Sequence, residues 1–181
     1  KLALARACEQ AGQFDVAVRM YQVCARTDAT YIAPAQFGLA RIGQARSDRA
    51  AALAALDRIP STSHSWGEAR YRRATLLAQP DAAGRHQLGD LDTALRELDG
   101  AGVPAAQRLG LRLPILAAAL EMTRTSAIPA GTTLGGLPVD ERSLRLEMEQ
   151  VYRDMAVTEE DRRERHALID AANRIRPWTT V

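Results

Sequence analysis

This sequence has few aromatic residues, no long apolar run and almost no net charge, and each of these features argues against a class of protein. Phenylalanine, tryptophan and tyrosine make up only 4% of the 181 residues, while alanine is abundant, which argues against an all-β fold. No run of about 18 apolar residues exists, so we expect no membrane span, and no signal peptide is recognisable. The net charge of +2 favours neither nucleic acid nor a membrane surface as a partner.

Side chains that bind metals are equally sparse. The two cysteines, Cys8 and Cys24, fall on successive expected helices, where small apolar side chains pack against their neighbours. A disulfide between them is geometrically possible, but we expect a cytoplasmic protein, in which thiols stay reduced. His64, His86 and His166 are scattered and have no spacing typical of a metal site. The sequence therefore predicts neither a metal nor any other cofactor.

Motifs of catalytic sites are missing as well. No glycine-rich phosphate loop follows a strand, and neither Gly-x-Ser-x-Gly nor His-Glu-x-x-His occurs. The acidic clusters at Glu147 and Glu159 resemble paired carboxylates, but adjacent residues of a helix diverge by about 100° and cannot share a substrate. A solvated helix face is the better interpretation, so we expect no enzymatic activity from this chain itself.

What the sequence does contain is a repeated helical pattern that begins at a turn glycine, Gly12. Apolar residues follow it at the helical spacing found in the second helix of tetratricopeptide (TPR) repeats. In each copy a small residue precedes a large apolar one by four places, so that a neighbouring helix can approach and the gap is filled. The three copies are Phe14, Ala17, Tyr21 and Cys24, then Arg49, Ala52, Leu56 and Ile59, then Gly89, Leu91, Ala94, Leu98 and Ala101.

This pattern predicts an all-α fold, a right-handed superhelix of about three TPR-like helical hairpins with a C-terminal helical cap. We expect a single TPR-like domain over residues 1–181. Its expected parts are repeats at about 1–29, 33–62 and 65–101 (the last with an insertion at 80–88), helices at about 105–124, 140–155 and 159–176, and a loop over 127–138. Pro114 should kink the first of these later helices or divide it in two.

Several acidic residues are placed to stabilise helix starts. We expect Asp15 and Asp48 to cap helices, because a carboxylate can accept from the free amides of the first turn. Residues 159–161 put three acids into the expected first turn of the last helix, which the helix dipole favours.

Two arginines and two aromatic residues occupy equivalent repeat positions and could share the concave groove of a TPR stack. Arg6 and Arg41 are 35 residues apart, and Phe37 and Tyr71 are 34 apart. A groove with these groups would suit an extended acidic peptide or a carboxylate. The alternative is that the arginines make ordinary salt bridges along the stack. The Lys/Asn carboxylate clamp of chaperone-binding TPR domains is absent.

The expected helix over 105–124 is more apolar than three small repeats need. Leu109, Leu113, Leu116 and Leu120 lie on one side of it. We therefore expect these leucines to form a packing or dimer surface, and we expect the chain to be a homodimer.

The C-terminal residues resemble one family more specifically than any TPR consensus. The pattern consists of Asp170, Asn173, Arg176 and Pro177, followed by threonines at 179 and 180. Together with the segments Phe37-Gly38-Leu39-Ala40-Arg41, Asp48-Arg49, Leu56-Asp57 and Ala69-Arg70, it resembles the C-terminal TPR region of the actinobacterial Ser/Thr protein kinase G (PknG) family.

The resemblance implies a longer parent with a rubredoxin-like metal module and a kinase domain, neither of which is present in this sequence. The start of the chain agrees with this expectation, since Lys1 opens inside a helical pattern without a methionine. The implied function is a non-catalytic interaction domain that supports the kinase domain of the same polypeptide and dimerises. The alternative is a free-standing module that binds an acidic peptide through Arg6, Phe37, Arg41 and Tyr71.

Overall fold

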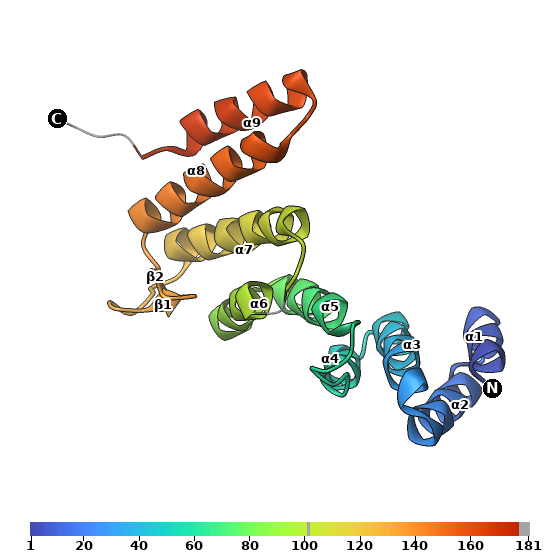
Figure 1. Cartoon of the computed structure of the whole chain (residues 1–181). Coiled ribbons are helices and arrows are strands. Elements are labelled where there is room, and N and C mark those ends of the chain that lie inside the picture. The colour runs from blue at the N-terminus through green and yellow to red at the C-terminus, as the bar shows by residue number, and fades with distance from the viewer. Residues whose placement is uncertain (101, 178–181) are drawn as a thin grey trace. The chain divides into compact units, whose positions relative to one another are not determined.

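The computed structural model describes residues 1–100 and 102–177, so Ala101 of the third repeat copy and the threonines at 179 and 180 lie outside the described residues. Within those ranges the chain forms nine α-helices, one 3-10 helix and two strands of two residues each (Figure 1). The predicted all-α class is confirmed. The chain divides into two compact units, Lys1–Leu76 and Leu77–Val181.

In the first unit the first four α-helices each pack on the next along the chain. Helix α1 packs on α2, α2 on α3, and α3 on α4 (Figure 1). The elements are α1 (Leu2–Gln10), α2 (Phe14–Thr27), the 3-10 helix η1 (Ala29–Tyr31), α3 (Ile32–Ala45), α4 (Arg49–Asp57) and α5 (Trp66–Ala78), whose last two residues belong to the second unit.

The repeat positions form the core of this unit. The small residues Ala17 and Ala52 are 0% exposed, and the large residues Tyr21 and Leu56, four places later, are 1% exposed. The burial pattern therefore repeats with the same 35-residue step as the sequence, and it confirms the predicted packing of the first two copies.

Glycine allows the closest helix contacts in the first unit. A Cβ atom on Gly38 of α3 would lie only 2.3 Å from Cζ of Tyr21, so this ring lies directly on the α3 backbone. A Cβ atom on Gly43 would lie 2.8 Å from the backbone nitrogen of Ala52, so α3 and α4 also approach backbone to backbone. Larger side chains at these positions would push the helices apart.

Only one of the two predicted caps in this unit forms. The Asp48 side chain accepts a 2.9 Å hydrogen bond from the Ala51 amide and caps α4. Helix α2 begins one residue before Asp15, so Asp15 lies within the first turn instead of capping it. Its carboxylate pairs with Arg46, at 2.7 Å, and the prediction for this residue was wrong.

The second unit contains longer helices around a leucine-rich core. Helix α7 packs on α6 and on α8, and α8 packs on α9 (Figure 1). Ala94 and Leu98, from the third repeat copy, are both 0% exposed. The elements are α6 (Leu88–Gly100), α7 (Ala105–Thr125), strands β1 (Thr133–Leu134) and β2 (Leu137–Pro138), α8 (Glu141–Thr158) and α9 (Arg162–Ile175).

An arginine links three helices of this unit. Arg112 of α7 donates from Nη1 to Asp99 of α6 at 3.1 Å and from Nε to Glu147 of α8 at 2.9 Å. Its side chain is only 21% exposed, so the two contacts act in a partly desolvated setting.

Of the two outcomes expected for Pro114, the division of the helix does not occur, because α7 runs unbroken from Ala105 to Thr125. The structure departs from the sequence predictions at two places in this unit. The expected loop over 127–138 contains an antiparallel hairpin that turns at Gly135 and Gly136, both with positive φ. Asp161 is the N-cap of α9, so residues 159–161 precede this helix instead of filling its first turn.

No helix within residues 1–100 and 102–177 has the length and apolar character needed to cross a bilayer.

Candidate functional site

The predicted groove residue Arg41 is held by a carboxylate that was not among the predicted site residues. Arg41 of α3 donates from Nε and Nη2 to the two oxygens of Glu9 on α1, at 2.7 and 2.8 Å. The Tyr21 hydroxyl of α2 donates to Glu9 at 2.6 Å. The three side chains join three successive helices. For Arg41, the salt bridge that the sequence left open as an alternative is the one that forms.

The contact shifts the pKa values of Glu9 and Tyr21 in opposite directions. The hydrogen bond from Arg41 lowers the pKa of Glu9 most strongly, burial opposes the shift, and Tyr21 lowers the pKa further. Burial, followed by the hydrogen bond to Glu9, raises the pKa of Tyr21 to about 12. At neutral pH Glu9 is therefore ionised and Tyr21 protonated, which is the combination that the observed hydrogen bonds require.

The other predicted groove residues lie on the same unit with different surroundings. Arg6 of α1 is exposed, and its positive charge contributes to the lowered pKa of Glu9. The partly buried ring of Phe37 lies 4.7 Å from the guanidinium carbon of Arg72, a cation–π contact. Tyr71 is partly buried on α5. The structure thus joins Arg41 to Glu9 and Phe37 to Arg72.

A buried arginine, Arg70, fastens α5 to the end of α4. Arg70 is 7% exposed and donates from Nη2 to the Leu56 carbonyl at 2.9 Å and from Nη1 to Asp57 at 3.2 Å. Its guanidinium carbon lies 4.1 Å from the centre of the Trp66 ring. These contacts satisfy the charge within the fold, so we assign Arg70 a structural role.

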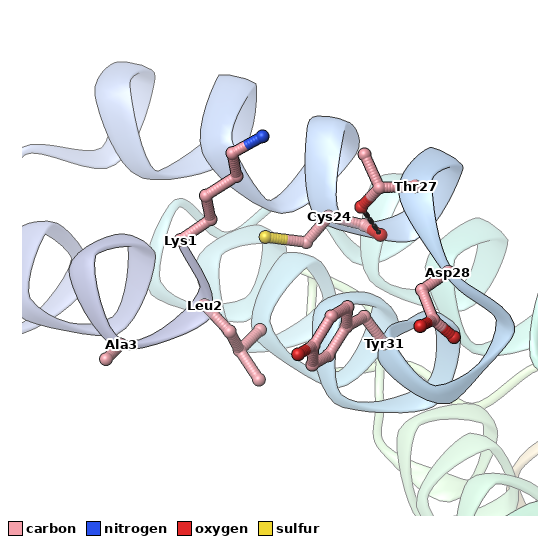
Figure 2. A pocket seen from close by; sticks show the side chains of 7 residues that line it. All are labelled: Lys1, Leu2, Ala3, Cys24, Thr27, Asp28 and Tyr31. Carbon is pink, nitrogen blue, oxygen red and sulfur yellow. Dashed lines mark hydrogen bonds between the residues drawn. The ribbon is translucent and has the colours of Figure 1, made fainter.

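A hollow of about 520 Å³ lies at the end of the first hairpin (Figure 2). Its lining includes Cys24, Asp28 and Tyr31, and the Thr27 hydroxyl donates to the Cys24 carbonyl at 2.9 Å. The Asp28 carboxylate accepts from the Thr30 amide and hydroxyl, which lowers its pKa. Asp28 is thereby the N-cap of η1, so its carboxylate stabilises the start of this helix.

Both cysteines occupy packing positions, as predicted. Cys24 is 1% exposed and Cys8 is 9% exposed, and both thiols are free. They belong to one apolar cluster with Ala5, Ala17 and Tyr21. No group of three or more possible metal ligands occurs within the part of the chain that the structure describes.

The predicted leucine surface is divided between core and exterior. Leu116 is 0% exposed and Leu120 is 6% exposed, so both serve packing inside the chain and are not available to another molecule. Leu109 and Leu113 are partly exposed. A contact with a second chain through this helix side is therefore limited to these two leucines.

The C-terminal motif residues fasten α9 to α8. Asn173 accepts from Arg153 at 3.3 Å, and Arg176 approaches Glu149 at 3.8 Å. Glu149 is 9% exposed and also accepts from Arg153 at 2.7 Å. Asp170 is exposed, and Pro177 follows the end of α9. The motif therefore closes the last hairpin.

Sequence reasoning missed Glu9, which is the centre of the first charge cluster. A signal for it exists, because Glu9 lies three residues after Arg6 and so on the same side of α1. Arg41 lies at the repeat position equivalent to Arg6, one helix pair further on. Identifying the partner of Arg41 required the packing of α3 on the first hairpin.

Comparison with known proteins places the chain among kinase-associated repeats. The sequence profile of the family described as "Protein kinase G tetratricopeptide repeat" matches residues 1–179. The chain is 30% identical over 181 residues to the serine/threonine-protein kinase PknG of Mycobacterium leprae, covering 100% of this chain and 23% of that protein. It is 31% identical over 180 residues to PknG of Mycolicibacterium smegmatis, covering 99% and 23%. The chain thus spans about a quarter of the length of these curated relatives.

Proposed function

The chain belongs to the protein kinase G tetratricopeptide repeat family, and we propose that it is a non-catalytic interaction domain that supports the kinase domain of the same polypeptide. We include in this proposal that the domain acts in the cytoplasm and takes part in homodimerisation. The relatives are named as serine/threonine-protein kinases, and 77% of their length (100% minus the 23% matched) is available for a kinase domain.

The observation that carries the proposal is the way in which charged side chains bind each other across helices. Glu9 binds Arg41, and Arg112 binds both Asp99 and Glu147. Such contacts fix the positions of helices, because a guanidinium and a carboxylate bind in a defined geometry. A rigid helical support, rather than a site for chemistry, is what this arrangement of polar groups favours.

Removal of the domain from the full-length polypeptide tests the support of the kinase. We expect the polypeptide without residues 1–181 to have a lower melting temperature of its kinase domain and lower phosphorylation of a peptide substrate. The matched control is the full-length polypeptide with Val157→Asp, at an 83% exposed position, which should leave both the melting temperature and the activity unchanged. A kinase domain with unchanged melting temperature and activity after the deletion would contradict the proposal.

Light scattering over a range of concentrations tests dimerisation. We expect the chain to dimerise and Leu109→Asp together with Leu113→Asp to shift it towards monomer, because these leucines are partly exposed on α7. Val157→Asp is the control, since Val157 is 83% exposed. A strict monomer at high concentration would remove dimerisation from the proposal and leave the kinase support standing.

The alternative function is the binding of an acidic peptide segment. The exposed cation Arg6 and the partly buried Phe37 support it, whereas Arg41 is already bound to Glu9. Arg6→Ala is therefore the informative variant, and Arg26→Ala, also exposed, is its control. Titration with an acidic peptide should show weaker binding for Arg6→Ala alone, and equal affinities of all three proteins would remove this alternative.

A further inference from the structure

An apolar groove lies along the first two helices, where Val16 and Met20 border the apolar cluster of the first unit and Leu4 and Val23 are exposed. Its volume is about 340 Å³, and it is lined by Lys1, Leu4, Val16, Arg19, Met20 and Val23. Leu4 is 55% exposed and Val23 is 47% exposed, and both are among the most exposed large apolar residues of the described chain. We call Leu4, Val16, Met20 and Val23 the N-terminal face.

The repeat register indicates what covers such a face. Leu39 occupies the position 35 residues after Leu4, and it packs against the cluster that Ala5, Tyr21 and Cys24 form with residues of α3. In the second hairpin Leu39 is thus covered by the preceding helix, α2, which packs on α3. In the first hairpin Leu4 occupies the same repeat position and is exposed. In repeat architectures each unit buries its open side against its neighbour.

We propose that in the full-length polypeptide the N-terminal face is covered by a further amphipathic helix, which packs on it as α2 packs on α3. This inference rests on the proposed function, because it requires the longer polypeptide that the relatives have. The helix continues the repeat by one step toward the N-terminus.

The rim of the groove specifies the charge of this helix. Lys1 and Arg19 lie on the groove beside the apolar residues. A helix with an apolar stripe flanked by Asp or Glu complements them, while one flanked by Lys or Arg would be repelled.

A second copy of the chain fits the groove less well. In a two-fold contact between two N-terminal faces, the cations Lys1 and Arg19 of one copy face the cations of the other copy. These like charges repel each other. The charge of the rim therefore favours a different, acidic segment over self-association through this face.

Thiol labelling measures whether the face is covered. Val23→Cys is introduced into the 181-residue chain and into the full-length polypeptide, and labelling of each cysteine is followed by peptide mass spectrometry. We expect the thiol at position 23 to react at least about tenfold more slowly in the full-length polypeptide, because a covered site reacts only when its cover opens. Val157→Cys, at an exposed position of α8, should react equally fast in both proteins. Equal rates at position 23 overturn the proposal.

A photo-crosslinking amino acid at position 23 of the full-length polypeptide identifies the cover. A crosslink to a helical segment of the same polypeptide, with an apolar stripe flanked by acidic residues, supports the proposal. A crosslink to a second copy, detected by mixing isotope-labelled and unlabelled protein, overturns it, and so does a crosslink to the kinase domain. If position 23 is protected while deletion of residues 1–181 leaves the kinase unchanged, the inference stands and the proposed function fails.

Discussion

The two compact units each use an arginine to join three successive helices, but they arrange the charges in opposite ways. In the first unit one carboxylate, Glu9, receives both Arg41 and Tyr21. In the second unit one guanidinium, Arg112, serves two carboxylates, Asp99 and Glu147. The first cluster thus depends on a single acidic group, whereas the second retains a contact after either acid is lost.

The units also differ in how closely their helices approach. Gly38 and Gly43 bring helices of the first unit into contact with a ring and with a backbone. In the second unit a Cβ atom on Gly89 or Gly110 would meet no neighbour within 4 Å. The first unit therefore packs through small residues and the second through leucines, so the two should respond differently to the same kind of substitution.

The largest expected effect is a cavity in the leucine core of the second unit. Leu116→Ala should lower the free energy of unfolding by about 2–5 kcal/mol, because Leu116 is fully buried and its neighbours cannot close the gap. Urea unfolding followed by circular dichroism measures the change. Leu109→Ala, at a partly exposed position of the same helix, is the control, and equal losses for both variants would show that α7 is not packed as described.

Added volume should damage the first unit more than the second. Gly38→Ala should cost about 1–3 kcal/mol, because the new methyl group requires the Tyr21 ring or α3 to move. Gly89→Ala, in the second unit, should instead stabilise by roughly 0.4–1 kcal/mol through the unfolded state. The same urea experiment measures both, and a neutral or stabilising Gly38→Ala would contradict the close contact.

The Glu9 cluster should make the first unit sensitive to acid. The pKa of folded Glu9 lies below its unfolded value of about 4.3, so its contribution is complete above that pH and is lost as the pH falls through the folded pKa. Glu9→Gln should cost about 1 kcal/mol at pH 7, since Arg41 is partly exposed and screened.

Stability measured between pH 7 and pH 3 checks this prediction. The unmodified chain should lose more stability on acidification than Glu9→Gln does, and the two curves should converge at low pH. Parallel curves would mean that the contact with Arg41 does not lower the pKa of Glu9 in the folded chain.

The smallest expected effect is the loss of one acid from the Arg112 cluster. Glu147→Gln should cost less than about 0.5 kcal/mol, because Arg112 keeps its contact with Asp99. A double-mutant cycle with Asp99→Asn should give a loss larger than the sum of the single losses. Strictly additive losses would mean that the two carboxylates do not substitute for each other.

Periodic burial is what made most of the fold predictable. Ala17 and Tyr21 reappear 35 residues later as Ala52 and Leu56, and the same helix face is buried in both copies. The hairpin at 133–138 was missed because strands of two residues carry no period. Its Gly135-Gly136 pair, with positive φ at both residues, was the available signal for a tight turn.

The candidate site was less predictable because it depends on contacts between distant residues. Glu9 and Arg41 are 32 residues apart, and their pairing arises only when α3 packs on the first hairpin. The four leucines of α7 follow one another at helical spacings of three or four residues, yet Leu116 is buried and Leu109 is partly exposed, since neighbouring helices cover only part of that side.

Pro114 leaves one backbone carbonyl of α7 without its helical hydrogen bond. Proline has no amide hydrogen, so the carbonyl of Gly110, four residues earlier, cannot make the usual helical hydrogen bond. Both residues are exposed, and water can therefore bind this carbonyl without entering the core. The next two residues, Ile115 and Leu116, turn away from this side and are fully buried. Because one helical hydrogen bond is missing on this exposed side, any bending of α7 should occur about the turn that contains Gly110 and Pro114.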